Sequence, residues 1–357
     1  MLTRTETKNK YGRKLVIAVT GLNAIDSPGP GVSVIRAIRE CPDFECRIIG
    51  LSYESLEPGL YMHDLVDKTY QIPYPMGGTD SLMSRLNYIH EIENLDIIIP
   101  NFDAELFNFI KLRDKLKLMG ISTFLPDLDQ FEARDKIKLF NFGKEHDFFV
   151  PEDKIIYDMR DLRKIEENFD YPIVVKGKFY DAIIAHSMEQ AEKAFQKIQA
   201  KWGLPIIVQE FIKGTEINIA ALGDGKGTAI SIIPMRKLYI TDKGKAWAGV
   251  TLDDDALIDL ARKFIHVTKW RGGCELEVML TTDGKPYIME VNPRFPAWIY
   301  LTAAAGQNQP ASLVKMALGE EVEPFTEYEV GKIFIRYAWD LITDIREFQK
   351  ISGTGEL

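Results

Sequence analysis

The stretch GGCELEVMLTTDGKPYIMEVNPRFP, residues 272–296, decides the fold of this 357-residue chain. Two apolar runs, 275–281 and 286–291, flank the dipeptide Asp283-Gly284, and this arrangement predicts a β-hairpin. Both predicted strands also carry carboxylates, and a carboxylate inside an apolar strand needs a partner. The hairpin is therefore either a solvated surface hairpin with scattered charges or one wall of a ligand site.

Three oxygen-bearing side chains can converge on one face of this hairpin. Glu290 and Asn292 are two positions apart, so an extended chain points them to the same face, and Glu277 can lie across from them. Arg294 follows directly as a neighbouring cation. Because Mg²⁺ is typically held by one or two carboxylates while nucleotide phosphates complete its shell, the set suits a magnesium ion.

The composition is that of an ordinary soluble globular protein, with 46% hydrophobic residues, 27% charged residues and a formal net charge of −9. The acidic balance argues against non-specific nucleic-acid binding, which needs clustered positive charge. No apolar run approaches the roughly 20 residues of a membrane span, and the polar N-terminus lacks a signal-peptide core. The three cysteines have no metal-like spacing and suit a reducing compartment. We therefore expect a cytoplasmic protein with no nucleic-acid or membrane partner, and a disordered lead-in at 1–13.

Residues 14–126 predict a compact parallel α/β domain. The apolar run KLVIAVTGL is followed by the loop NAIDSPGPG and by a helix with apolar residues at helical spacing, a unit typical of doubly wound sheets. Gly29 and Gly31 match no phosphate-loop pattern, although the loop could still line a site. Asp103 follows a later strand, where it either contacts a ligand or caps a helix.

Beyond residue 126 the pattern becomes mixed, and candidate polar residues are spread along it. Lys136 lies early in a helix predicted within 127–150, where a solvated helix face would be the ordinary interpretation. Lys176 ends a β-branched run, where its head can reach a phosphate as a compact point charge. Gln209 and Glu216 flank a turn between two strands, and an amide and a carboxylate placed there suit a nucleoside.

Taken in order, these pieces resemble the ATP-grasp superfamily, in the branch that includes the carbamoyl phosphate synthetase large subunit and the carboxylate–amine ligases. The resemblance covers roughly residues 14–320 and is densest over 130–296. The ordered set is much more specific than any single member, and EVNPRF is the most specific piece. The motifs are DK at 135–136, PIVVK ending at Lys176, VQEFIKGTE ending at Glu216, ELEVML and MEVNPRF.

The resemblance implies an α/β and α+β chain, with an N-terminal parallel α/β domain followed by an ATP-grasp fold of two α+β subdomains. We place the N-terminal, pre-ATP-grasp domain at 14–126 and the ATP-grasp domain at 127–320. Within the latter, a small lid-like subdomain is expected at about 150–212 and a larger catalytic subdomain at about 213–320. Residues 321–357 are expected to form a C-terminal extension packed on the catalytic subdomain.

The resemblance also implies roles for the nucleotide-binding residues. Lys136 and Lys176 match the two basic residues that hold the ATP phosphates, and Glu216 matches the ribose-binding acid. The family's glycine-rich flap is short here, KGKFYDAI with one glycine, so closure over the phosphates would rest on Lys178 or on another loop. Gln209 matches the side chain that contacts the adenine amino group, as an amide in place of the commoner acid. Glu210, Phe211 and Ile212 match the hinge whose backbone meets the adenine ring.

The metal and catalytic residues follow in the same way. Glu277, Glu290 and Asn292 match the magnesium ligands of the family, for which Mn²⁺ can substitute. Arg294 matches the arginine near the γ-phosphate and the acyl phosphate. By side-chain chemistry, Arg236 on a predicted strand is our candidate for the substrate carboxylate or the transferring phosphoryl group, and a surface arginine is the alternative.

The activity implied is an ATP- and Mg²⁺-dependent, ADP-forming ligase that joins a carboxylate to an amine through an acyl phosphate. Its substrates would be small molecules or peptides, and a homodimer is a family-level expectation. A single ATP-grasp unit excludes a full carbamoyl phosphate synthetase, and the absence of a biotin-handling signature disfavours a carboxylase-type enzyme. The remaining alternatives are an ATP-grasp phosphotransferase and a non-catalytic nucleotide-binding regulatory protein.

Overall fold

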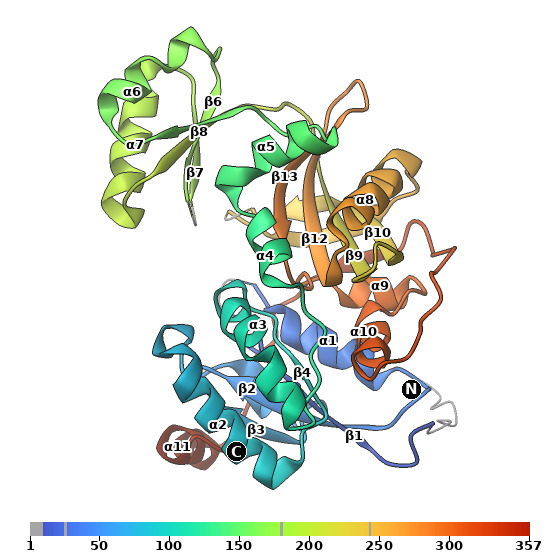
Figure 1. Ribbon diagram of the computed structural model, residues 1–357. Helices are drawn as coiled ribbons and strands as arrows, with labels where there is room; N and C mark the ends of the chain where they lie inside the picture. The colour runs from blue at the N-terminus through green and yellow to red at the C-terminus, as the bar shows by residue number, and fades with distance from the viewer. Residues whose placement is uncertain (1–9, 25–26, 179–180, 243) are drawn as a thin grey trace. The chain divides into compact units, whose positions relative to one another are not determined.

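The computed structural model describes residues 10–24, 27–178, 181–242 and 244–357 (Figure 1). Most of the predicted disordered lead-in, residues 1–9, lies outside the described residues. The chain forms two compact units, each assembled from separate segments. Unit 1 comprises Met1–Phe131, Asn218–Glu275 and Asn292–Leu357, and unit 2 comprises Glu132–Ile217 and Leu276–Val291. The predicted domain limits at 126 and 320 stay predictions.

Unit 1 begins with a parallel sheet of strand order β3-β2-β1-β4, which confirms the predicted parallel α/β fold. The strand β4 is the bare run Ile-Ile-Ile, fully buried, as expected for a parallel sheet covered on both faces. The elements are β1 (Leu15–Val19), α1 (Pro30–Arg39), β2 (Cys46–Ser52), β3 (Lys68–Gln71), α2 (Gly78–Glu93), β4 (Ile97–Ile99) and α3 (Asp103–Leu118).

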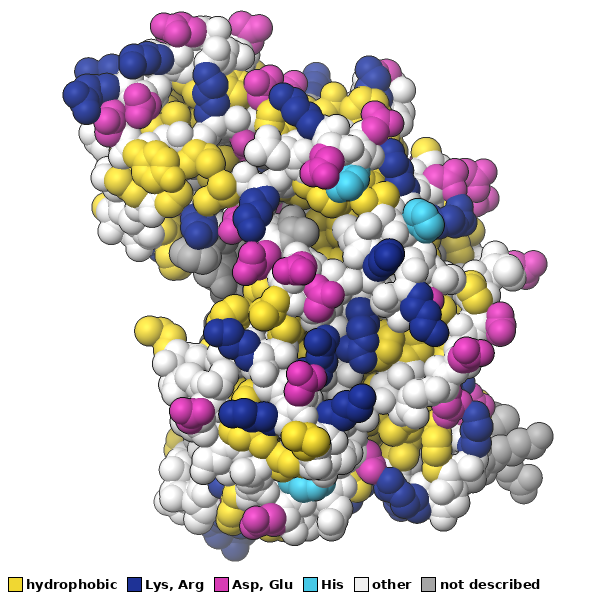
Figure 2. Space-filling view, viewed as in Figure 1, with side chains coloured by type: hydrophobic (Ala, Val, Ile, Leu, Met, Phe, Trp, Pro, Cys, Tyr) yellow, Lys and Arg dark blue, Asp and Glu magenta, His cyan; other side chains and the backbone are white. Residues whose placement is uncertain are grey.

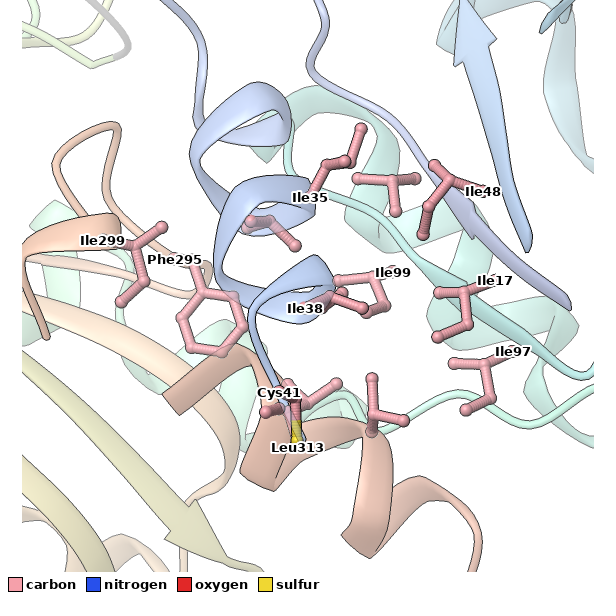
Figure 3. Packing of buried hydrophobic residues seen from close by; sticks show 14 of the residues in the cluster. Ile17, Ile35, Ile38, Cys41, Ile48, Ile97, Ile99, Phe295, Ile299 and Leu313 are labelled. Carbon is pink, nitrogen blue, oxygen red and sulfur yellow. The ribbon is translucent and has the colours of Figure 1, made fainter. Parts of the chain in front are cut away.

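Helix α1 packs its apolar face into the main hydrophobic core of unit 1. Proline at its first turn and apolar residues at helical spacing favour the helix. Ile35 and Ile38 meet Ile17 of the sheet, while Phe295 and Ile299 lie on the other side of the helix (Figure 3). One core therefore joins the N-terminal sheet to the residues that follow the EVNPR motif.

A long sheet of strand order β13-β12-β9-β10-β11-β14 follows, in which β11 pairs antiparallel with both β10 and β14. Unit boundaries fall inside β9, β12 and β13, so these strands contribute residues to both units. Helix α8 packs on β10. The elements are β9 (Thr215–Asp224), β10 (Ala229–Ile240), β11 (Ala246–Thr251), α8 (Asp255–Thr268), β12 (Arg271–Leu280), β13 (Pro286–Asn292), α9 (Tyr300–Ala304), α10 (Gln309–Ala317), β14 (Ile333–Ile335) and α11 (Ile345–Thr354).

The predicted hairpin is confirmed as β12 and β13. The backbone N–H of Thr281 donates to the carbonyl of Lys285 at 3.0 Å, and Gly284 has a φ of +80°, which only glycine adopts readily. The Asp283-Gly284 dipeptide therefore forms the turn that was predicted from the sequence.

The last residues of the chain extend the N-terminal sheet at its β3 edge. Thr69 and Leu357 exchange two backbone hydrogen bonds, each of 3.0 Å, and the N–H of Gln71 donates to the carbonyl of Gly355 at 2.8 Å. In Figure 1, α11 accordingly lies beside α2 and β3. The strand predicted at the start of 331–348 is found only as the short β14.

Unit 2 contains an antiparallel sheet of strand order β5-β8-β6-β7. Helices α6 and α7 cover one of its faces (Figure 1), and Phe195 of α7 packs against Val175 and Val208 of the sheet. The elements are β5 (Asp153–Ile156), α6 (Met159–Arg163), β6 (Ile173–Gly177), β7 (Ala182–Ala185), α7 (Met188–Trp202) and β8 (Ile206–Glu210).

The helix predicted within 127–150 is divided into α4 (Leu128–Ala133) and α5 (Lys136–His146). The side chain of Asp135 accepts a hydrogen bond from the N–H of Ile137 at 3.0 Å and so caps α5. Capping therefore ends one helix and starts the next, and it makes Lys136 the first residue of α5. Among the described residues, no helix combines the length and apolar character that crossing a membrane requires.

Candidate functional site

Two predicted nucleotide-binding side chains of unit 2 lie on neighbouring strands. Nζ of Lys176, on β6, donates to Oε1 of Gln209, on β8, at 2.5 Å. Gln209 pairs in register with Val174, two positions before Lys176, so both polar side chains share one face of the sheet. The residues assigned to phosphate and to adenine are therefore adjacent.

Lys176 lies in a partly desolvated cluster of charges. Burial, and after it the neighbouring Lys136, lower its pKa to about 8, whereas the carboxylates of Glu290, Glu277 and Asp153 oppose the shift. Nζ of Lys136 lies 3.2 Å from Oε2 of Glu290. Unit 2 thus gathers two lysines and two of the predicted metal ligands around one point.

Asp153, at the start of β5, belongs to this cluster and was missed from the sequence. Burial raises its pKa to about 6, and its Oδ2 atom has no hydrogen-bond partner among the described residues. It pairs in register with Gln209. An aspartate at the beginning of a short strand looks like ordinary turn chemistry, so no sequence signal singled it out.

The other predicted nucleotide contacts follow β6 and β8. The backbone N–H of Glu210 donates to the carbonyl of Glu152 at 2.9 Å, so this hinge position is already engaged. Phe211 and Lys178 are half-buried, Ile212 is buried, and Glu216 is exposed on β9. Residues 179–180 of the predicted flap lie outside the described residues.

Arg294 in unit 1 lies between two carboxylates. Its Nε atom is 2.9 Å from Oδ2 of Asp103, and its NH1 atom is 3.5 Å from Oε2 of Glu275. Asp103 is the first residue of α3, and Phe102 occupies the capping position, so the carboxylate of Asp103 serves the arginine and does not cap the helix. Asp103 and Glu275 therefore hold the guanidinium group of Arg294 between them.

Glu275 is a buried carboxylate that organises this part of unit 1, and the sequence analysis missed it. It accepts hydrogen bonds from Asn218 Nδ2 at 2.7 Å, from Trp298 Nε1 at 2.8 Å and from Asn292 Nδ2 at 3.2 Å. The bond from Asn292 fixes the orientation of its amide. Of the predicted metal ligands, Asn292 belongs to unit 1 and Glu277 and Glu290 to unit 2.

Among the residues that the structure describes, Arg236 has no hydrogen bond or ion pair with these side chains, and its neighbour Met235 is buried in the main core of unit 1. Arg236 lies on β10 and is exposed. Its role toward the substrate carboxylate or the transferring phosphoryl group stays a prediction.

A second polar cluster lies at the carboxyl ends of β1, β2 and β4. The buried Glu105 accepts hydrogen bonds from Thr20 Oγ1 at 2.5 Å and from the hydroxyl of Tyr53. Glu57 accepts from the N–H of Tyr53 at 2.8 Å, and burial raises the pKa of Glu57 to about 7. This edge of a parallel sheet is a usual ligand position.

The glycines of the first loop have a packing role. A Cβ atom on Gly31 would come within 2.2 Å of the Thr20 carbonyl oxygen, and one on Gly29 within 2.3 Å of Asn23 Oδ1. The N–H of Gly31 also donates to the carbonyl of Gly21 at 2.9 Å. Close approach of α1 to the end of β1 explains these glycines without a phosphate.

Comparisons with known proteins agree with this architecture. Residues 204–334 match the family described as "ATP-grasp in the biosynthetic pathway with Ter operon". A D-alanine--D-alanine ligase of Cupriavidus metallidurans is 27% identical over 177 residues, which are 45% of this chain and 54% of that protein. The carbamoyl phosphate synthase large chain of Caldanaerobacter subterraneus subsp. tengcongensis is 21% identical over 283 residues, 69% of this chain. The chain spans about half of the first relative and 25% of the second.

Solved structures resemble the chain over most of its length. The biotin carboxylase domain of Hydrogenobacter thermophilus 2-oxoglutarate carboxylase, crystallised with MgADP, has a TM-score of 0.67 and 17% identity, covering 86% of this chain and 70% of that one. An L-amino acid ligase from Bacillus licheniformis has a TM-score of 0.64 and 16% identity, covering 87% and 75%. Such low identities show the fold alone. The family match shows an ATP-grasp domain at residues 204–334, and the relatives and solved structures are what the rest of the chain is similar to.

Proposed function

We propose that this protein is an ATP- and Mg²⁺-dependent ligase that joins a carboxylate to an amine and releases ADP and phosphate. The main support is the charge cluster of unit 2, in which Lys176 interacts electrostatically with Lys136, Glu277 and Glu290. Two partly desolvated lysines beside two carboxylates suit a polyphosphate that arrives with a divalent cation. The names of two similar proteins, a D-alanine--D-alanine ligase and an L-amino acid ligase, support the reaction class.

The candidate residues have the chemistry that a nucleotide and its cation need. Lys136 and Lys176 would neutralise phosphates, Lys178 would assist from the flap, Gln209 would meet the adenine amino group and Glu216 the ribose. Oxygen atoms are the donors that Mg²⁺ prefers, and Mn²⁺ could replace it. The oxygen donors would come from Glu277, Glu290 and Asn292. A bound cation would supply charge neutralisation on the phosphates.

The chemistry needs little acid or base assistance from the protein. An oxygen of the substrate carboxylate attacks the γ-phosphorus, the bond to the β-γ bridging oxygen breaks, and ADP leaves. An amine then attacks the acyl carbon, loses a proton and expels phosphate. Positioning and charge neutralisation dominate such steps. Arg294, held by Asp103 and Glu275, would stabilise the acyl phosphate.

The decisive experiment measures ADP release over pairs of amino acids and short peptides, with hydroxylamine added in parallel. A ligase of this kind releases ADP only with its carboxylate and yields a hydroxamate when hydroxylamine traps the acyl phosphate. A stable phosphorylated product with no hydroxamate would indicate a phosphotransferase. ATP binding with no ADP release for any carboxylate would indicate a regulatory nucleotide-binding protein. A cytoplasmic location and the domain limits 14–126 and 127–320 belong to the same proposal.

A further inference from the structure

A row of large apolar side chains on and after β14 is exposed. Ile333, Ile335, Tyr337 and Trp339 are 54%, 71%, 74% and 84% exposed, and they occupy alternate positions. Alternation places them on one side of an extended chain, whereas Phe334 between them packs against the core of unit 1. We call these four residues the β14 strip. Soluble monomers rarely leave so many large apolar side chains contiguous and exposed.

The strip lies at an edge of the long sheet. Ile335 pairs in register with Ala248 of β11, and the ladder continues through the N–H of Arg336, which donates to the Trp247 carbonyl at 2.8 Å. In the strand order of the described residues, β14 is the last strand. Its outer backbone groups can therefore pair with another extended chain. Tyr239, 66% exposed, shares the cross-strand row of Ala248 and Ile335 and widens the strip.

Arg336 and Asp340 carry opposite charges on either side of the centre of the segment 332–344. Arg336 is half-buried over the Phe334 ring and donates to the Ala246 carbonyl at 3.0 Å, yet within the described part of the chain it has no carboxylate partner. Asp340, four positions later, is exposed and pairs with no cation among those same residues. The segment KIFIRYAWDLITD, 332–344, carries its cations in its first half and its anions in its second.

We propose that the β14 strip is an interface between two copies of this chain, paired antiparallel about a two-fold axis at Ala338. In that register Arg336 faces Asp340 of the second copy, whereas Lys332 and Asp344 keep their partners Glu329 and Arg346 within each copy. On the other face, the apolar pairs are Tyr337 with Trp339 and Ile335 with Leu341. In such a contact both copies contribute the same surface, so the assembly ends at a dimer. It does not depend on the proposed ligase activity.

Sedimentation velocity of the full chain, from about 1 to 100 μM, tests the interface. The contact is at the small end of interface sizes, so we expect a monomer–dimer equilibrium in the micromolar range. Trp339→Lys should raise the dissociation constant at least tenfold without affecting the fold, because this side chain is exposed. Leu118→Lys, which changes an 89% exposed residue of α3, is the matched control and should leave the equilibrium unchanged. A wild-type chain that stays monomeric, or a Trp339→Lys dimer as tight as the wild type, overturns the proposal.

Disulfide trapping tests the register. Ala338→Cys would bring the two new thiols together at the axis, within the Cα separation that a disulfide allows, and a thiol oxidant should yield a covalent dimer. In the matched control Thr343→Cys, five positions from the axis, the thiols would be roughly 34 Å apart. Linking through residue 343 and not 338 refutes the proposed register. If the wild type is monomeric but a different protein occupies the strip, neither variant forms a covalent dimer, and the self-pairing proposal fails.

Discussion

Nζ of Lys136 lies 3.2 Å from Oε2 of Glu290. A lysine assigned to phosphate and a carboxylate assigned to magnesium therefore lie side by side. The pair joins the first residue of α5 to β13, so it brings two of the predicted ligand-binding groups to one place.

Glu290→Gln should abolish Mg²⁺-dependent turnover while retaining the fold. The amide keeps the shape of the side chain but removes the charge that holds the cation, and we expect ADP release to fall at least about 100-fold. The double variant Glu290→Ala with Asn292→Ala should behave in the same way. Turnover is measured against Mg²⁺ concentration, and Glu189→Gln on the exposed face of α7 is the control. Unchanged turnover would remove the metal assignment.

Lys176 should make nucleotide affinity depend on pH. Its pKa is lowered to about 8 by burial, so the ammonium that would meet phosphate is lost as the pH rises above 8. The dissociation constant of a non-hydrolysable ATP analogue should therefore rise up to about tenfold per pH unit above that value. Lys176→Arg stays charged and should remove the midpoint near pH 8. Identical profiles for the two proteins would show that Lys176 does not contact the phosphates.

Glu275→Gln should impair the reaction through its neighbours. The variant weakens the bonds that orient Asn292 and Arg294 and should cost about 1–3 kcal/mol of unfolding free energy. Because Glu275 is a positioning residue, its substitution should raise the Mg²⁺ concentration for half-maximal turnover by about 10- to 100-fold. Glu323→Gln, on an exposed segment of unit 1, is the control. A loss of stability with unchanged Mg²⁺ dependence would reduce Glu275 to a purely structural role.

Glu57 should lower stability as the pH rises. Burial raises its folded pKa from 4.5 to about 7, so between these values the folded protein binds the additional proton and loses stability with increasing pH. The slope from this residue is at most about 1.4 kcal/mol per pH unit. Glu57→Gln should remove it, as measured by urea unfolding at pH 5 and pH 7.5. The neighbouring exposed Glu54→Gln should retain the wild-type slope, and a Glu57→Gln protein that also retains it would contradict the assignment.

Local chemistry explains what could be predicted from the sequence. The Asp283-Gly284 turn specifies the hairpin within a few residues, and the ordered motifs identified Lys136, Lys176 and Gln209 before any contact was known. Glu275 could not be found in this way, because its partners Asn218 and Trp298 are 57 and 23 residues away. The division between α4 and α5 reflects a capping side chain competing with helix continuation at Asp135.

The surface shows why charge alone said little about partners. Basic and acidic side chains are interspersed over much of the visible face (Figure 2), consistent with a net charge of only −9 in 357 residues. Discriminating features lie instead in a few contacts, such as the paired Lys136 and Glu290.

The backbone pairing of β3 with the end of the chain has a consequence for protein synthesis. Thr69 and Leu357 are 288 residues apart, so β3 leaves the ribosome long before its outer partner exists. At about 5–20 residues per second, that interval lasts roughly 15 to 60 s. Throughout it the nascent N-terminal sheet presents an open margin to other chains and to chaperones. The first sheet to be made is thus among the last parts of unit 1 to be completed.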